Sequence, residues 1–167
     1  MKKILSLTLA LAMLGTALTG CGSKTAAPET SVEPTQQTAP YQQEQSQTEK
    51  ALALINTFAT GDTDTARSLL SDGYIQHNLA YGTGADAFIG SVEYLASADV
   101  KTTVNNIRAF EDGDKVFLQT IYNFAGAGEQ IAFDIFRFGE NGKIAEHWDV
   151  METIADQSTW QNQNGKF

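Results

Sequence analysis

The sequence predicts a single α+β domain in residues 48–167. Three segments before residue 100 carry apolar residues at every third or fourth position, which is the spacing of a helix that packs one face on a core. Four later segments alternate apolar and polar residues, as half-buried strands do, and short turns separate them. Helices followed by an antiparallel meander of strands are typical of an α+β fold.

The first helix is predicted from residue 46 to residue 61. Its apolar residues recur at the i, i+3, i+4 and i+7 spacing: Ala51, Leu54, Ile55 and Phe58. Ser46 and Glu49 have the spacing of a capping box, in which the two residues satisfy each other's free backbone N–H groups. Gly61 follows at the position where a glycine commonly ends a helix.

Two shorter helices follow. The second begins at an Asp62 or Asp64 cap and is expected to end at Gly73, with three residues facing inward: Ala66, Leu69 and Leu70. The third lies within residues 82–99 and has four apolar residues on one stripe: Ala87, Phe88, Val92 and Leu95.

The period changes to two after Asp99. The predicted strands lie within residues 100–111, 115–126, 129–138 and 143–154. Turns at "EDGD" and "GENG" and a glycine-rich turn between them make an antiparallel meander the simplest topology. The tail beyond Ile154 is polar apart from Trp160, which we expect to pack back on the sheet.

The N-terminal residues predict export from the cytoplasm. Lys2 and Lys3 precede an apolar run and small residues, which is the pattern of a secretory signal peptide over residues 1–20. The run from Ile4 to Leu18 is too short for a transmembrane span. The stretch "LTGC" resembles the lipobox of bacterial lipoproteins, which implies that Cys21 is lipidated. The alternative is a plain signal peptide followed by a cysteine without a role.

Residues 21–47 are predicted to tether the domain to the membrane. The stretch after Cys21 is rich in Ser, Thr, Gln and Ala, and it holds all three prolines of the chain. The predicted location is therefore the extracytoplasmic face of the cell membrane, held by the lipid anchor at Cys21. The net charge of −9 argues against nucleic acid as a partner. A single cysteine excludes an internal disulfide.

The last two predicted strands place three polar side chains on one face of the sheet. If residues 139–142 form a four-residue loop, Asp134 lies opposite His147. Asp149 is two residues from His147 and therefore shares its face. A three-residue loop is the alternative, and it would move Asp134 opposite Trp148.

Apolar side chains are expected around these polar groups: Phe136, Phe138 and Met151. A carboxylate in such surroundings needs a hydrogen-bonding partner, which the imidazole of His147 can supply. Pairs of this kind make a carboxylate able to take a proton from carbon. The alternative is that Asp134 and His147 only satisfy each other within a core.

The chain's other histidine, His77, lies in the stretch "YIQHN" after the second predicted helix. Tyr74, His77 and Asn78 are candidates for the mouth of a pocket, although His77 alone also fits a surface loop. The stretch "HWD" raises the alternative of an iron site with two histidines and one carboxylate, in which His77 would have to be the second histidine. The preferred interpretation of the site is free of metal.

Three stretches resemble the SnoaL-like polyketide cyclases of the nuclear-transport-factor-2-like superfamily. They are "YIQHN" (residues 74–78), "DIFRF" (134–138) and "NGKIAEHWDVMETI" (141–154). The resemblance implies a cone-shaped α+β barrel, in which a bent antiparallel sheet wraps around the N-terminal helices and encloses a deep apolar pocket. It also implies a homodimer formed through the outer face of the sheet, where Trp148 and Val150 are expected.

The resemblance further implies a chemistry. In the characterised cyclases an aspartate of the last strand, matched here by Asp149, is the general acid/base of an aldol ring closure without a cofactor. His147 matches a histidine of the family pattern, and His77 and Asn78 fall in the loop at the pocket mouth. Asp134 stands where the family has a histidine, and this departure places the polyketide substrate in doubt.

The predicted function is therefore cofactor-free acid/base catalysis on a small carbonyl compound. Asp149 is the expected base, His147 orients it or carries the proton, and Asp134, His77, Asn78 and Tyr74 bind the substrate. A lipoprotein that binds a small molecule or acts as a scaffold without catalysis is the alternative.

Overall fold

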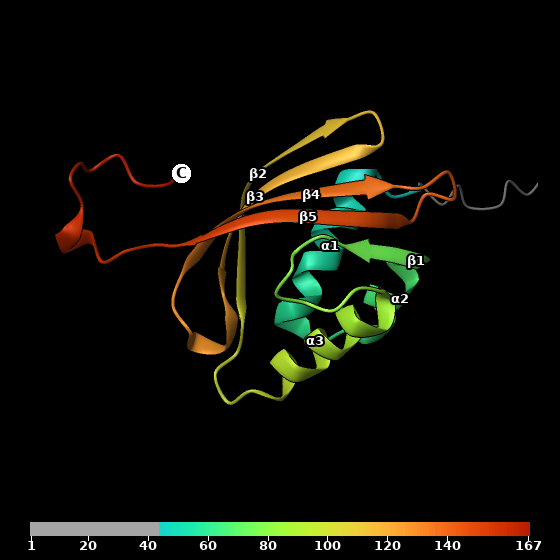
Figure 1. Cartoon of the computed structure of the whole chain (residues 1–167), viewed down its shortest axis with the longest axis horizontal. Coiled ribbons are helices and arrows are strands. Elements are labelled where there is room, and N and C mark those ends of the chain that lie inside the picture. The colour runs from blue at the N-terminus through green and yellow to red at the C-terminus, as the bar shows by residue number, and fades with distance from the viewer. Residues whose placement is uncertain (1–43) are drawn as a thin grey trace, which may run out of the picture. The chain divides into compact units, whose positions relative to one another are not determined.

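The computed structural model describes residues 44–167 (Figure 1). The predicted signal peptide, Cys21 and nearly all of the predicted tether lie outside these residues. No helix within residues 44–167 has both the length and the apolar character to cross a membrane. The elements, in chain order, are α1 (Gln47–Thr60), α2 (Thr63–Leu69), β1 (Leu70–Gln76), α3 (Ala85–Ser97), β2 (Thr103–Asp112), β3 (Lys115–Asn123), η1 (Phe124–Gly126), β4 (Gln130–Phe138), β5 (Ile144–Thr153) and η2 (Gln157–Thr159).

The five strands form one sheet in the order β1-β5-β4-β3-β2. Strands β2 to β5 form the antiparallel meander that the sequence predicts, and β1 adds to the edge of β5 in parallel. The sheet is strongly curved and the three helices lie on its concave side (Figure 1). The predicted α+β fold, with a bent sheet around N-terminal helices, is confirmed.

Helix α1 has the ends that its sequence indicates. Ser46 and Glu49 form the reciprocal capping box, with Oγ of Ser46 accepting from the backbone of Glu49 at 3.1 Å. Gly61 ends the helix in the left-handed region, with φ of 74°, where glycine alone carries no steric penalty. A side chain there would also collide with Ala96 of α3, because a Cβ atom would lie 2.8 Å from its Cβ. This glycine therefore lets α1 and α3 approach closely.

Strand β1 was missed at the sequence level. Helix α2 ends at Leu69, and Gly73 lies inside β1 rather than at the end of a helix. The strand is short and contains Asp72 and Gly73, which both disfavour strands. Its pairing partner, β5, begins more than sixty residues later in the chain, so no local pattern reveals the pairing.

The register of β4 and β5 differs from both loop predictions. Asp134 pairs with Asp149, not with His147 or Trp148. The difference has two parts. Phe138 pairs with Ile144 instead of the expected Lys143, which shifts the register by one residue, and Arg137 pairs with Glu146, which leaves Ala145 as an extra residue and shifts it by one more. The result is a shift of two residues from the four-residue-loop pairing. An even shift keeps every side chain on its predicted face.

The tail folds back beyond β5. The indole of Trp160 donates to the carbonyl of Ala155 at 2.9 Å, and a small hollow at this end is lined by Trp160, Glu152 and Ile154. Further along, Gln119 of β3 donates to the carbonyl of Lys166 at 2.9 Å. Trp160 therefore packs against the end of β5 and against the tail itself, whereas the prediction was packing on the sheet in general.

Candidate active site

A cavity of about 640 Å³ lies between the concave face of the sheet and helices α1 and α3. Its wall is rich in aromatic side chains: Phe58, Tyr74, Tyr81, Phe88, Tyr94, Tyr122, Phe124 and Phe136. Tyr81 and Tyr94 are 50% and 73% exposed and mark its rim. Small-molecule sites commonly have this size and this apolar lining, with a few polar groups at fixed places.

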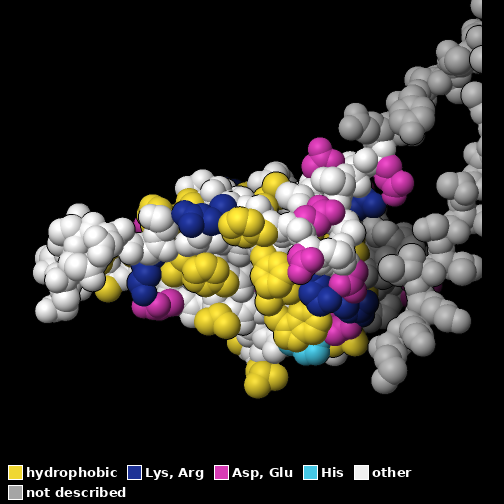
Figure 2. Space-filling view, turned by 90° about the horizontal axis from the view of Figure 1, so that it is seen from above, with side chains coloured by type: hydrophobic (Ala, Val, Ile, Leu, Met, Phe, Trp, Pro, Cys, Tyr) yellow, Lys and Arg dark blue, Asp and Glu magenta, His cyan; other side chains and the backbone are white. Residues whose placement is uncertain are grey.

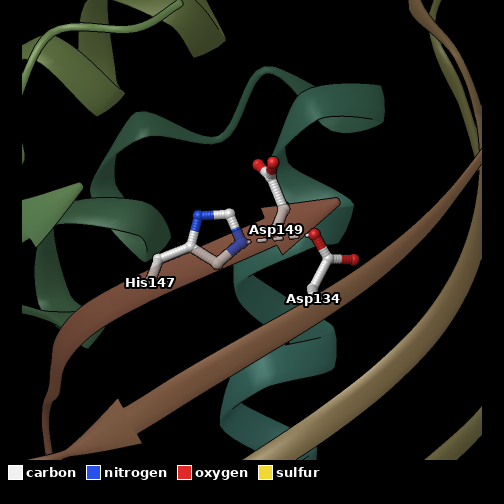
Figure 3. Close-up of side chains that lie close together, drawn as sticks. All are labelled: Asp134, His147 and Asp149. Carbon is white, nitrogen blue, oxygen red and sulfur yellow. Dashed lines mark hydrogen bonds and ion pairs between the residues drawn. The ribbon is translucent and has the colours of Figure 1, made fainter. Parts of the chain in front are cut away.

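Three of those polar groups come from β4 and β5 and meet at the wall of the cavity (Figure 3). Asp134 and His147 are buried, and Asp149 is partly buried. One carboxylate oxygen of each aspartate and one ring nitrogen of His147 all lie within 4.8 Å of one another. The imidazole of His147 points at Asp134, with 3.2 Å between Nε2 and Oδ1 (Figure 3). The predicted convergence of the three side chains on one face is therefore present in the structure.

Gln76, which the sequence analysis did not single out, sets the tautomer of His147. The side-chain oxygen of Gln76 accepts the backbone N–H of Asn78 at 2.9 Å, so the other end of the amide is the donor. That NH₂ group lies 3.0 Å from Nδ1 of His147 and 3.3 Å from the hydroxyl of Tyr74. Nδ1 must therefore accept, which leaves the proton on Nε2, where it is donated to Asp134. The imidazole is neutral in this arrangement.

The two carboxylates differ in how many donors they receive. Asp134 accepts from His147 on Oδ1 and from the hydroxyl of Tyr122 on Oδ2, at 2.9 Å. Asp149 accepts from the side-chain amide of Asn78 on Oδ1, at 2.7 Å. Its other oxygen receives no hydrogen bond from residues 44–167. Asp149 is thus the carboxylate with an oxygen free to take a proton.

His77 does not belong to the cavity. Its neighbours Gln76 and Asn78 point inward, so the extended backbone turns His77 to the outer face of the sheet. There its ring stacks on Trp148 with 4.4 Å between centroids, and Nε2 lies 3.0 Å from a carboxylate oxygen of Glu146. The expectation that His77 binds the substrate is therefore corrected.

The outer contacts of His77 fasten this segment to β5. The backbone N–H of His77 donates to the carbonyl of His147 at 2.9 Å. Hydrogen bonds from His77, followed by those from Arg137, hold the pKa of Glu146 below its ordinary value. The stack and the hydrogen bonds outside thus hold in place the strand end that carries Gln76 and Asn78 inside.

The comparisons with known proteins agree with this architecture. The profile of the SnoaL-like domain family matches residues 51–147, which is more than half of the chain. The chain belongs to the SnoaL-like domain family. Comparison with curated proteins found no match.

Solved structures resemble this SnoaL-like domain in fold. A nuclear-transport-factor-2-like protein of unknown function from Cytophaga hutchinsonii is 16% identical, with a TM-score of 0.57 over 66% of this chain and 94% of that chain. An LEH-like epoxide hydrolase of M. tuberculosis is 17% identical, with a TM-score of 0.56 over 64% and 82%. IdmH from Streptomyces antibioticus, a proposed polyketide cyclase, is 18% identical, with a TM-score of 0.52 over 65% and 93%. At these identities the likeness establishes the fold.

The side chains of this SnoaL-like site are arranged to hydrogen-bond one another rather than to bind a metal ion. A metal would need a bare Nε2 on His147, but Gln76 keeps the proton there. Both oxygens of Asp134 already accept hydrogen bonds. The iron site with two histidines also fails on geometry, because His77 lies on the opposite face of the sheet from Asp149.

Gln76 and Tyr122 are the site residues that sequence reasoning missed. Residues 74, 76 and 78 have the period of a strand, and this signal would have placed Tyr74, Gln76 and Asn78 on one inward face. Tyr122 lies one strand away from Asp134 on β3 and carries no local signal of its role.

We expect nitrogen-15 NMR to find His147 as the neutral Nε2–H tautomer, and Gln76→Leu to change that spectrum. Leucine removes the donor that faces Nδ1, so the proton can occupy either nitrogen. The matched control is Gln161→Leu, the same replacement at an exposed position of the tail outside the cavity, which should not alter the signals of His147. A wild-type His147 protonated on Nδ1 would contradict the tautomer assignment.

Two buried tyrosines should stay protonated in the folded state under alkaline conditions. Burial, followed by the negative charges of Asp149 and Asp134, raises the pKa of Tyr74 above its ordinary value. Burial and the charge and hydrogen bond of Asp134 raise the pKa of Tyr122 well above its ordinary value. Unfolded tyrosines ionise near pH 10, so the folded state binds more protons above about pH 10 and its stability falls as pH rises from there.

An ultraviolet titration of the folded protein checks this expectation. Tyr74→Phe and Tyr122→Phe should each remove one late-ionising group while leaving the remaining curve in place. The stability loss above about pH 10 should also become smaller in each variant, because each removes one linked proton. Full ionisation of every tyrosine near pH 10 without unfolding would show that these hydroxyls are not sheltered.

Proposed function

We propose that this SnoaL-like domain catalyses cofactor-free acid/base chemistry on a small carbonyl compound, of the aldol-condensation, cyclase or isomerase type. The observation that carries the proposal is the single free oxygen of Asp149 at an aromatic cavity. Asn78 holds the other oxygen of that carboxylate at 2.7 Å and so fixes its direction. The wall around it is rich in apolar side chains, so a bound substrate would hold the reacting carbon beside a positioned base.

The proposed reaction begins when Asp149 takes a proton from the carbon next to a carbonyl group. The electron pair of the broken C–H bond forms the C=C bond of an enolate, and the negative charge moves to the carbonyl oxygen. The hydroxyl of Tyr74 accepts from Gln76, and its own proton has no acceptor within residues 44–167. Tyr74 is thus the donor available to the developing oxyanion.

The enolate then has two outcomes. In an aldol step its carbon attacks a second carbonyl carbon, a C–C bond forms, and the new alkoxide takes a proton. In an isomerisation a proton returns to a different carbon. Asp149 supplies the proton in both cases and ends ionised as it began. In this scheme Asn78 orients the base, a role predicted for His147, whose ring nitrogens instead face Gln76 and Asp134. His147 and Asp134 form a polar floor beneath the substrate.

The first test is hydrogen exchange catalysed by the purified chain. Aromatic methyl ketones and 1,3-diketones in D₂O should gain deuterium next to the carbonyl faster with the protein than with buffer alone, as proton NMR measures. No acceleration over a broad set of carbonyl compounds, together with capture of an unaltered small molecule from cell extract, would favour the alternative of a binding protein.

We also propose that the domain is anchored to the extracytoplasmic face of the cell membrane through Cys21. The support is the sequence alone, namely the signal-peptide pattern and the "LTGC" stretch before the tether. Labelling with a palmitate analogue in the native host tests it. The label should disappear in Cys21→Ala, and label retained by that variant would refute the anchor.

A homodimer through the outer face of the sheet is a third proposal, supported by apolar side chains that gather there (Figure 2). Phe110, Phe117, Ile135 and Trp148 stand opposite one another on four neighbouring strands. Beside them, Phe133 and Val150 are 54% and 72% exposed. Exposed apolar patches of this kind mark interfaces. Sedimentation should find a dimer, and Phe133→Glu should give a monomer; a monomeric wild type would refute it.

A further inference from the structure

The cavity carries negative charge that no residue of its wall balances. Asp134 and Asp149 line it, whereas no lysine or arginine does within residues 44–167. Two arginines of neighbouring elements are engaged elsewhere. Arg67 pairs with Asp86, and Arg137 pairs with Glu146 on the outer face of the sheet.

His147 does not supply the missing positive charge. The NH₂ group of Gln76 faces Nδ1 at 3.0 Å, and a protonated Nδ1 would place two donors against each other. The aromatic wall also keeps the site from behaving like open water, so charges interact more strongly there than at a surface. A ligand in this cavity therefore meets two carboxylates without a compensating cation.

We infer that the cavity selects its ligand by charge, taking uncharged or cationic aromatic compounds and excluding carboxylates and phosphates. That this ligand is a substrate rests on the proposed function, and its class is then an uncharged cyclic or aromatic carbonyl compound. An anion about 5 Å from one carboxylate loses roughly a hundredfold in affinity at an effective dielectric constant of about 20. A cation gains from the same carboxylates and from the ring faces around it.

The two charges also act on neighbouring groups. The charges of Asp149 and Asp134 add to burial in raising the pKa of Tyr74, and that of Asp134 does so for Tyr122. Both rings belong to the wall of the cavity. A ligand that occupies the same space experiences the same field.

The test uses matched triples of aromatic compounds that differ only in one substituent. On the naphthalene skeleton these are 2-acetylnaphthalene, 2-naphthoate and 2-naphthylmethylamine, and equivalent triples on benzene and biphenyl extend the set. Calorimetry or ligand-observed NMR with the purified chain gives the affinities. We expect each anion to bind more than about tenfold more weakly than its uncharged partner, and the amine at least as tightly as that partner. Equal affinity for acid and ketone would overturn the inference.

A variant with two substitutions separates charge from shape. Asp134→Asn with Asp149→Asn removes both charges while keeping side-chain size. The ratio of the affinity for the ketone to the affinity for the carboxylate should therefore fall by more than about tenfold. The matched control combines Asp112→Asn and Asp72→Asn, which alter net charge equally at exposed positions outside the cavity. If this affinity ratio falls equally in the control, the selection comes from the charge of the whole protein and the inference fails. Far-ultraviolet circular dichroism verifies that each variant folds.

The outcome is distinguishable from that of the proposed function. Selection by charge with no exchange activity on any ketone would leave the ligand class standing and remove the acid/base chemistry. Exchange activity with equal binding of acids and ketones would support the acid/base chemistry and remove the inferred ligand class.

Discussion

Replacing Asp149 by asparagine should lower the exchange rate on a carbonyl substrate by about 10²- to 10⁴-fold, the range that a positioned general base contributes. Asparagine has nearly the same shape and can still accept the hydrogen bond of Asn78, so the fold and the cavity should persist. What it lacks is the ability to bind the proton. The measurement is kcat/KM for deuterium incorporation, with thermal unfolding as the check on structure.

Asp134→Asn is the informative comparison for that result. Both oxygens of Asp134 already accept hydrogen bonds, from His147 and Tyr122, so this carboxylate is not free to act as the base. Its substitution should lower the rate less than that of Asp149 and should cost more stability, because one buried donor is left facing an NH₂ group. If Asp134→Asn abolished exchange while Asp149→Asn retained it, the two carboxylates would have to exchange roles.

The sequence predicted which face each side chain of β4 and β5 occupies better than it predicted their pairing. Period-two alternation depends only on the backbone, so Asp134, His147 and Asp149 share a face in any register that is shifted by an even number of residues. The exact partner depends on the turn. There the pairing of Phe138 with Ile144 and the extra residue Ala145 each shifted the register by one, which moved Asp134 from His147 to Asp149, and no local pattern marks such a bulge.

The parts that could not be predicted depend on contacts between distant segments. Gln76 meets His147, and Asn78 meets Asp149, in each case across 71 positions of sequence. These contacts exist only because β1 joins the edge of β5, and a short strand with Asp72 and Gly73 gives no propensity signal for that. His77 was mistaken for a pocket residue for the same reason, since its direction follows from the strand.

Phe136→Ala should lower the free energy of unfolding by about 3–5 kcal/mol, the usual cost of removing a buried aromatic ring. Phe136 is 1% exposed, and its ring is stacked on the imidazole of His147 with 4.4 Å between centroids and 11° between planes. Total stabilities of natural domains are about 5–15 kcal/mol, so this one substitution removes a large share. Urea denaturation measures the change.

Phe136→Leu separates the two tasks of that ring. Leucine keeps much of the apolar volume against Val116, which pairs with residue 136 from β3, so the loss of stability should be smaller than with alanine. The flat support of His147 is lost equally in both variants, so the imidazole and its contact with Asp134 should become less well ordered in both. Equal destabilisation by leucine and alanine would instead mean that the stack with His147 stabilises the core more than the buried volume does. The polar site would then be a structural element of the sheet as well as the proposed catalytic centre.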